Sequence, residues 1–209
     1  NSVINAFLDD YALLIDAFVA LYQATFDEKW LNKTNELTQY VMDNFYDEKS
    51  RMFFYTSSQD APLVARKKEL SDNVIPASNS VMAKNLFHLG TYLYKDDYLK
   101  QARDMMNTMI IQFEDSEQPS FYSNWCSLLF RLTYEPYEVA IIGDDFAEKR
   151  KEIDKHYLPN ALLLGGKTEG SLELLENKLI EDETRIYVCK KKVCKLPVNE
   201  VGKALKLME

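Results

Sequence analysis

Carboxylate side chains that could act as an acid and base pair occur in two segments of the chain. Asp9 and Asp10 stand near the start of an apolar helical pattern, and Asp72 shortly precedes a second such pattern. Hydrolysis of a glycosidic bond needs two carboxyl groups, one as acid and one as base or nucleophile. We therefore take Asp10 and Asp72 as candidate catalytic residues. The alternative for Asp9 and Asp10 is structural, because carboxylates in a first helical turn complement the positive helix end.

Cations and small polar side chains accompany these carboxylates. Arg66 and Lys68 are two residues apart at the end of a predicted strand, so their side chains would point to the same side. Beside the carboxylates they would form either an ion-pair cluster or a clamp for a polyhydroxylated or anionic substrate. The full set of candidate substrate-binding residues is Asp9, Tyr11, Arg66, Lys68, Asn79 and Ser80.

Histidine, cysteine and glycine offer three other chemistries. His88 and His156 both lie away from the candidate segments, which argues against a histidine proton carrier there. Cys189 and Cys194 flank three lysines and would be structural cysteines or a redox pair, since two thiolates are half of a zinc site. Residues 142–145 lack the further glycines of a dinucleotide fingerprint. We expect no metal and no cofactor.

Helical patterns must position these residues. From Phe7 to Tyr22 apolar residues cover most of a helix circumference, which predicts an inner helix, whereas Trp30 to Phe45 carries one apolar stripe, typical of an outer helix. A second helix pair repeats the first at an offset of 68 residues: Leu21/Leu89, Trp30/Tyr98, Leu31/Leu99, Leu37/Met105, Val41/Met109 and Phe45/Phe113. The sequence therefore predicts repeated helical hairpins, with a fifth helix beginning near Pro119.

Strand patterns occur in two places. The β-prone runs 52–55 and 63–65 flank a turn and predict a β-hairpin inserted between the helices. Beyond Pro136, strand patterns at 138–142, 161–164 and 185–189 alternate with a helical pattern at 147–156, which indicates a small, partly parallel sheet. The predicted fold is mainly α, with helical hairpins over residues 1–136 and an α/β subdomain over 137–209.

Composition excludes several partners and locations. The formal charge of −8 without a basic stripe argues against nucleic acid, and no run approaches the roughly 20 apolar residues of a membrane span. The first residues lack the pattern of a signal peptide and suggest a start within a longer parent. Three cysteines make no disulfide framework, so we expect a reducing, cytoplasmic location.

Five motifs occur in an order that resembles a known family. They are Phe7-Leu-Asp-Asp-Tyr-Ala12, Arg66-x-Lys68, Asp72 with Pro76-Ala-Ser-Asn-Ser80, Tyr137-Glu-Val-Ala-Ile-Ile-Gly143 and Tyr187-Val-Cys-x4-Cys194-x2-Pro197. This set is similar to the C-terminal part of YyaL-type thioredoxin-domain-containing proteins, which are related to the spermatogenesis-associated protein of animals. The resemblance implies a thioredoxin-like domain followed by a six-hairpin (α/α) toroid similar to N-acylglucosamine 2-epimerases and glycosidases.

The resemblance implies a function for this part of the parent. In such toroids the loops before inner helices converge on a central cleft, which would bring Asp10 and Asp72 to one mouth and bind or process a carbohydrate-like small molecule. The alternative is a non-catalytic helical interaction module attached to the thioredoxin-like domain. Where the family tends to have small residues, this chain has Asn73, Val74, Ala77 and Ser78, so side chains stand where the backbone could otherwise approach a ligand closely. The expected partner of this chain is the N-terminal remainder of the parent. An inner helix that lacks its neighbouring helices would expose an apolar flank, which predicts self-association.

Overall fold

The computed structural model describes residues 5–61, 64–114 and 116–209, and the described part is mainly helical, as predicted. The side chains of Phe113 and Glu114 lie outside the described part, and the predicted equivalence of Phe45 and Phe113 therefore stays a prediction. The chain divides into two compact units. Unit 1 comprises residues up to 19 together with 31–132, and unit 2 comprises 20–30 together with 133–209. Residues 20–30, which were expected in the helical part, thus group with the C-terminal residues.

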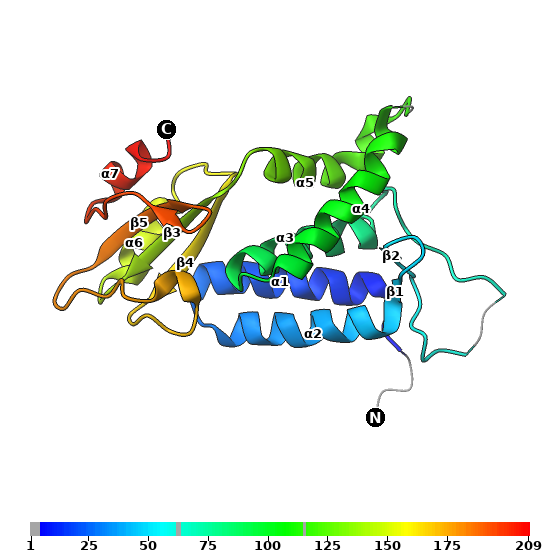
Figure 1. Cartoon of the computed structure of the whole chain (residues 1–209), viewed down its shortest axis with the longest axis horizontal. Coiled ribbons are helices and arrows are strands. Elements are labelled where there is room, and N and C mark those ends of the chain that lie inside the picture. Colours follow the sequence, from blue (N-terminus) through cyan, green and yellow to red (C-terminus); the bar gives the residue numbers. More distant parts are fainter. Residues whose placement is uncertain (1–4, 62–63, 115) are drawn as a thin grey trace. The chain divides into compact units, whose positions relative to one another are not determined.

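Unit 1 is built from helices that pack in pairs. They are the first part of α1 (Leu8–Thr25), α2 (Lys29–Phe45), α3 (Ser78–Tyr92), α4 (Asp96–Glu114), the 3-10 helix η1 (Pro119–Tyr122) and α5 (Ser123–Thr133). In Figure 1, α1 and α2 run antiparallel side by side, and α3 packs against α4. α3 also contacts α1, because the Asn85 side chain donates to the Ala12 carbonyl at 2.8 Å and the Lys84 ammonium lies 3.0 Å from Asp16.

The two predicted inner helices differ in burial. α3 is buried on nearly all sides, including the polar residues Asn85 and His88. α1 buries one face, but Leu13 and Leu14 on another face are 40% and 43% exposed. The prediction that α1 is buried on several sides is therefore wrong for the chain by itself. Its apolar circumference exceeds what the neighbouring helices in this chain cover.

The inserted β-hairpin forms with one of the two predicted strands: the run 52–55 contains β2, but its partner is β1 and not the run 63–65. β1 (Tyr46–Asp47) pairs antiparallel with β2 (Met52–Phe53), and Arg51 adopts a positive φ of 60° in the turn. Of the second predicted strand, Leu63 lies outside the described residues, and Val64 is fully exposed and not in a strand. The exposed Val64 side chain is thus not packed in a sheet as predicted. Among the described residues of this loop, Tyr55 N donates to Lys67 O at 2.8 Å.

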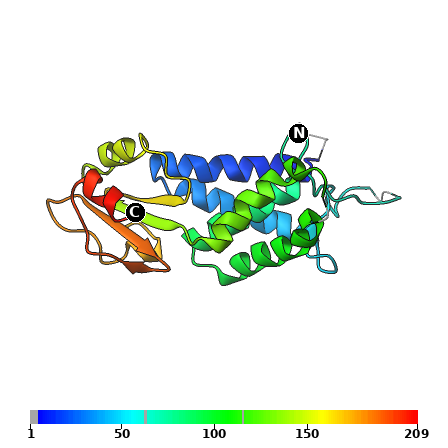
Figure 2. The same ribbon diagram turned by 90° about the horizontal axis from the view of Figure 1, so that it is seen from above.

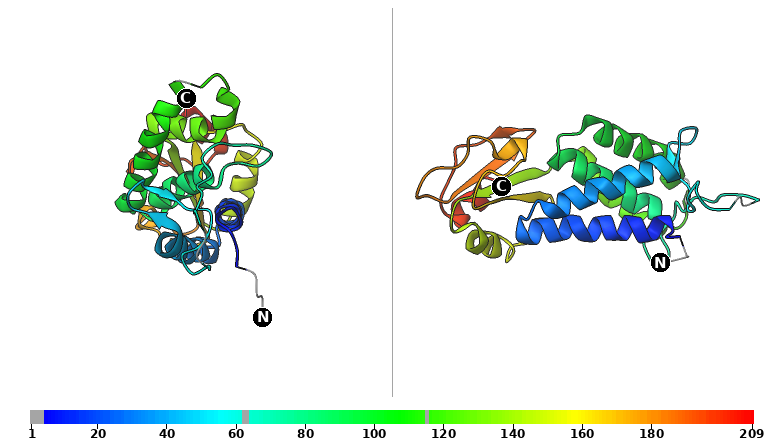
Figure 3. Two further views of the ribbon diagram at one scale, coloured as in Figure 1. Left: turned by 90° about the vertical axis from the view of Figure 1, so that its right-hand side faces the viewer. Right: turned by 90° about the horizontal axis from the view of Figure 1, so that it is seen from below.

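Unit 2 contains a four-stranded sheet of order β4-β3-β5-β6. Its strands are β3 (Tyr137–Ile142), β4 (Ala161–Gly166), β5 (Arg185–Lys190) and β6 (Val193–Cys194). β3 and β4 are parallel and joined by α6 (Phe146–Ile153), whereas β5 is antiparallel to both β3 and β6. Figures 2 and 3 show α6 on one side of this sheet. The predicted strands and partly parallel pairing are thus confirmed.

Alternate residues of the sheet form the core of unit 2. Val139, Ile141 and Leu163 face Ile153 of α6 and the helix α7 (Val201–Lys206), while the short 3-10 helix η2 (Glu173–Leu175) contacts β3. Gly165 permits the close parallel approach, since a Cβ there would lie 1.9 Å from the Ile141 carbonyl oxygen. Within the described part of the chain, none of the helices combines the length and apolar character needed to cross a bilayer.

Candidate functional site

The N-terminal ends of α1 and α3 lie at the same end of unit 1. The Leu8 amide donates to Tyr55 O at 3.0 Å, and Tyr55 N donates in turn to Lys67 O. Asn79 N then donates to Glu69 O at 3.4 Å. This chain of backbone bonds joins the segment that begins at Asp9 to the segment that ends at Ser80, and Figure 1 shows both helices starting at that end.

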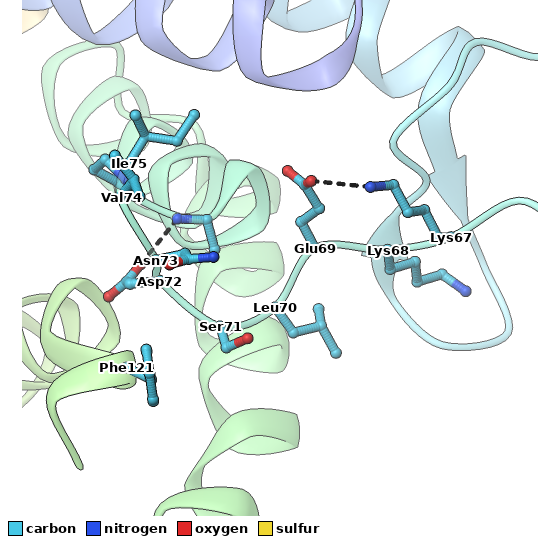
Figure 4. Close-up of a pocket in the computed structure, with 12 residues that line it drawn as sticks. Lys67, Lys68, Glu69, Leu70, Ser71, Asp72, Asn73, Val74, Ile75 and Phe121 are labelled. Atoms are coloured by element: carbon cyan, nitrogen blue, oxygen red, sulfur yellow. Dashed lines mark hydrogen bonds and ion pairs between the residues drawn. The ribbon is translucent and has the colours of Figure 1, made fainter. Parts of the chain in front are cut away.

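A hollow of about 600 Å³ lies beside this junction. It is lined by residues 67–77 and Phe121, and Figure 4 shows Lys67 and Glu69 toward one side and Asp72 toward Phe121 on the other. Of the predicted site residues, Lys68 and Asp72 line the hollow. The contacts of each candidate side chain are described in turn below.

Asp72 is a buried carboxylate whose acceptor positions are all in use. Oδ1 accepts from Ala77 N at 2.9 Å and from the Ser80 hydroxyl at 3.1 Å. Oδ2 accepts from Asn124 N at 2.9 Å and from the Ser123 hydroxyl at 3.3 Å. An ionised carboxylate offers about four lone-pair sites. Asp72 therefore joins the beginning of α3 to the beginning of α5, and it is 6% exposed.

Asn79 and Ser80 serve the same junction. The Asn79 side-chain amide forms two hydrogen bonds with the backbone of Phe53, as a neighbouring strand would. Its Oδ1 accepts from Phe53 N at 2.8 Å, and its Nδ2 donates to Phe53 O at 2.9 Å. Nδ2 also donates to Glu69 O at 3.0 Å. The Ser80 hydroxyl is shared between Asp72 and Ala77 O, 2.8 Å away. Both side chains are buried and fix the backbone around the hollow.

Arg66 and Lys68 meet at the ring of Phe54. Each cation lies 4.1 Å from the ring centroid, a distance at which the ring face attracts positive charge. The Arg66 guanidinium also donates to the carbonyls of Thr56 and Asn44. The Lys68 ammonium lies 2.8 Å from Asp47, and hydrogen bonding to this ammonium lowers the pKa of Asp47 to about 2. Lys68 thus pairs with a carboxylate of β1, a partner that sequence reasoning missed.

Asp10 and Tyr11 have local partners near the start of α1. Asp10 Oδ2 accepts from Phe7 N at 2.9 Å, which is the capping geometry of a helix N-terminus, and its side chain is otherwise exposed. The Tyr11 ring packs 5.3 Å from Tyr40 and 5.5 Å from Phe45, and burial raises its pKa. The structure therefore does not bring Asp10 and Asp72 to one shared partner.

A polar group that sequence reasoning did not assemble lies between α1 and the hollow. We call Asp9, Tyr55, Lys67 and Glu69 the Tyr55 cluster. The Tyr55 hydroxyl donates to Asp9 at 3.2 Å, the Lys67 ammonium lies 4.6 Å from the Tyr55 ring centroid, and it pairs with Glu69 at 3.3 Å. Burial, and then the charge of Asp9, raise the pKa of Tyr55 to about 12. Alternation at 66–68 could have indicated Lys67, whose side chain points away from those of Arg66 and Lys68.

The described residues contain no group of three or more histidine, cysteine or acidic side chains placed to hold a metal ion. The chemistry that remains at this end of unit 1 is that of hydrogen-bond donors and acceptors beside apolar side chains. Phe121 is 41% exposed where it lines the hollow, and Ile75 is also exposed there. Such a mixture suits recognition of a small molecule with both hydroxyl groups and apolar faces.

Comparison with known proteins gives relatives but no matching family model. Spermatogenesis-associated protein 20 of Homo sapiens is 24% identical over 216 residues, an alignment covering 97% of this chain and 27% of that protein. The Mus musculus protein of the same name gives the same identity and coverage. An uncharacterised protein of Caenorhabditis elegans is 25% identical, with 96% and 28% covered. The chain thus spans just over a quarter of the length of these relatives, and along nearly its whole length it resembles one part of spermatogenesis-associated protein 20.

Proposed function

We propose that this chain forms one wall of a binding site for a carbohydrate-like small molecule, at the end of unit 1 where α1 and α3 begin. The observation that carries the proposal is the composition of the hollow. Lys67 and Glu69 offer a donor and an acceptor on one side, while Phe121 and Ile75 offer apolar surface. A sugar ring presents hydroxyl groups at its edge and C–H groups on its faces, so it matches both kinds of surface.

The proposed role of these residues is binding. Hydrolysis would require one carboxyl group to take up or give a proton at the substrate. Asp72 can do so only by giving up hydrogen bonds that hold the first turns of α3 and α5. Asp10 is exposed and holds one backbone amide of α1. The Asp10 and Asp72 pair therefore remains a prediction from sequence, and the contacts of Asp72 favour a structural part for it.

We further propose that the helical hairpins belong to an (α/α) toroid in a longer parent that also carries a thioredoxin-like domain. This is supported by the junction of the two segments before α1 and α3 and by the apolar circumference of α1. The rest of the parent would then supply the remaining wall of the site. Binding to this chain alone is expected to be weaker than binding to the parent.

The test is a titration with a panel of monosaccharides, disaccharides and sugar phosphates, followed by ligand-observed NMR on the chain and calorimetry on the parent. We expect at least one sugar to bind, and Lys67→Met and Glu69→Gln each to weaken it about tenfold, which corresponds to about 1.4 kcal/mol. The matched control is Lys33→Met with Glu36→Gln, an exposed ion pair of α2, and it should leave binding unchanged. Failure of every sugar to bind the parent would refute the proposal.

A second candidate is a non-catalytic helical module, and the exposed leucines of α1 are the observation that favours it. Leu13 and Leu14 offer an apolar surface, and a second copy of the chain would bury it. Light scattering at high concentration should then show a dimer that Leu13→Gln with Leu14→Gln returns to a monomer. A monomer for the unmodified chain at every concentration would contradict this alternative.

A further inference from the structure

Cys189 and Cys194 form a disulfide across the β5–β6 hairpin of unit 2. The two residues face each other directly in the antiparallel register. Their environments differ, because Cys189 is 1% exposed within the sheet, whereas Cys194 is partly exposed on the edge strand β6. Of the two residues, Cys194 is therefore the one that a reagent in solution can approach more easily.

The hairpin is held by contacts that do not need this disulfide. Lys190 pairs with Val193 in the turn, and Lys195 N donates to Val188 O at 3.0 Å. Farther along, Ile186 and Val198 exchange two backbone bonds of 2.7 and 3.0 Å. The two cysteines are only five residues apart, and the loop-closure entropy removed by a cross-link falls as the loop shortens. Reduction is thus expected to leave the fold of unit 2 intact.

Four lysines lie close to the disulfide in sequence. Lys190, Lys191, Lys192 and Lys195 lie within the hairpin or directly beside it, in a chain whose net charge is −8. Their ammonium groups are spread over several partners, with Lys190 4.1 Å from the Tyr137 ring centroid, Lys191 paired with Glu135 and Lys192 3.0 Å from Glu173. Neighbouring cations stabilise thiolates and attract anionic reagents. This is the environment in which thiol–disulfide exchange is favoured.

We propose that Cys189 and Cys194 are a reversible thiol–disulfide exchange couple whose reaction partner is a dithiol. A thiolate of the partner attacks Cys194 Sγ, a mixed disulfide forms, and the electron pair of the broken S–S bond goes to Cys189 Sγ, which takes a proton from solvent. The second thiolate of the partner then attacks the partner's first sulfur, which is bonded to Cys194 in the mixed disulfide. This attack releases Cys194 as a thiolate, which takes a proton from solvent. Two electrons and two protons pass to the chain, and the partner becomes a disulfide.

The exchange is tested with dithiothreitol as the dithiol, on the whole chain carrying Cys126→Ser. Cys126 is the free, exposed cysteine of unit 1, so its removal leaves only the proposed pair. After equilibration in buffers of varied dithiothreitol oxidation state, thiols are alkylated and counted by mass spectrometry. We expect one two-electron transition without denaturant and an unchanged circular dichroism spectrum. A disulfide that is reduced only in denaturant, or a reduced chain that unfolds, would overturn the proposal.

Two further measurements test the direction of attack and the role of charge. Cys189→Ser leaves the Cys194 thiol and should capture an aromatic disulfide reagent rapidly, whereas Cys194→Ser should react slowly. Equal rates would refute the assignment of Cys194 as the attacked sulfur. Lys191→Gln with Lys192→Gln should slow reduction of the disulfide by anionic glutathione severalfold but leave the rate with uncharged dithiothreitol unchanged. A loss that is the same for both reductants would refute steering by the lysines.

Discussion

Replacement of Asp72 by asparagine should destabilise unit 1 strongly, although the change removes little volume. The remaining carbonyl oxygen can still accept from Ala77 N, but the new amide group faces Asn124 N, where a donor then meets a donor. A hydrogen bond to a charged group contributes about 1.5 to 3 kcal/mol, and an unsatisfied buried donor costs about 1 to 3 kcal/mol. We therefore expect a loss of about 2 to 4 kcal/mol, and about 3 to 5 kcal/mol for Asp72→Ala, which removes both helix caps.

Urea unfolding followed by tryptophan fluorescence measures this loss. The chain has two tryptophans, and Trp125 of α5 is fully buried and donates to Leu70 O at 2.6 Å, next to the Asp72 junction. A Trp30→Phe background makes the signal specific to Trp125. Asp10→Asn is the matched control, because Asp10 is exposed and holds one backbone amide, and it should cost no more than about 1 kcal/mol. If Asp72→Asn costs as little as this control, the view of Asp72 as a structural junction is wrong.

Three other perturbations have defined outcomes. Gly165→Ala should lower the thermal midpoint of unit 2 sharply in calorimetry, because the new Cβ would lie 1.9 Å from a carbonyl oxygen. The control Gly202→Ala in α7 places its Cβ in open space and should be neutral or stabilising by up to about 1 kcal/mol. Similar effects of the two substitutions would contradict the close approach at Gly165. His88 is buried, and neither ring nitrogen has a hydrogen-bond partner among the described residues; burial, then the charges of Arg131 and Lys84, hold its pKa well below 6.5. Below pH 6.5 the unfolded chain therefore binds a proton at His88 that the folded chain does not. The free energy of unfolding should decrease as the pH is lowered, by at most about 1.4 kcal/mol per pH unit from this residue. Urea titrations at several pH values should show that His88→Gln removes this contribution. Asp9→Asn should move the Tyr55 pKa from about 12 toward 10, as seen by NMR titration of the labelled ring, and an unchanged value would show that Asp9 contributes nothing.

The helices and strands were largely predictable because their signal is local. The apolar stripe of α2 follows from residues three and four apart, and the strands of unit 2 from short apolar runs bounded by turn residues. The different outcome at Val64 and Ala65 has the same origin. A β-prone run becomes a strand only when a partner strand and an apolar surface are present, and within the described residues Val64 is exposed and outside any strand.

The candidate site was less predictable because its contacts join distant residues. Asp72 is satisfied by Asn124, 52 positions later, and no local pattern at either residue indicates the bond. Arg66 and Lys68 both contact the ring of Phe54 although residues 66–68 are not in a strand, and the sequence could not show that Phe54 and Asp47 are their partners. Charged residues near a predicted cleft are therefore weak indicators of chemistry until their partners are known.

The side chains that stand in place of small residues change how a ligand would be held. Asn73 and Val74 line the hollow, yet it keeps a volume of about 600 Å³, and Val74 is 94% exposed rather than packed into it. A glycine-rich loop would let a ligand approach backbone amides closely. Here the Asn73 amide is already used in the loop, donating to Ile75 O at 3.0 Å, so this amide is not free to bind a ligand. In the proposed site, specificity rests on Lys67, Glu69 and the exposed ring of Phe121.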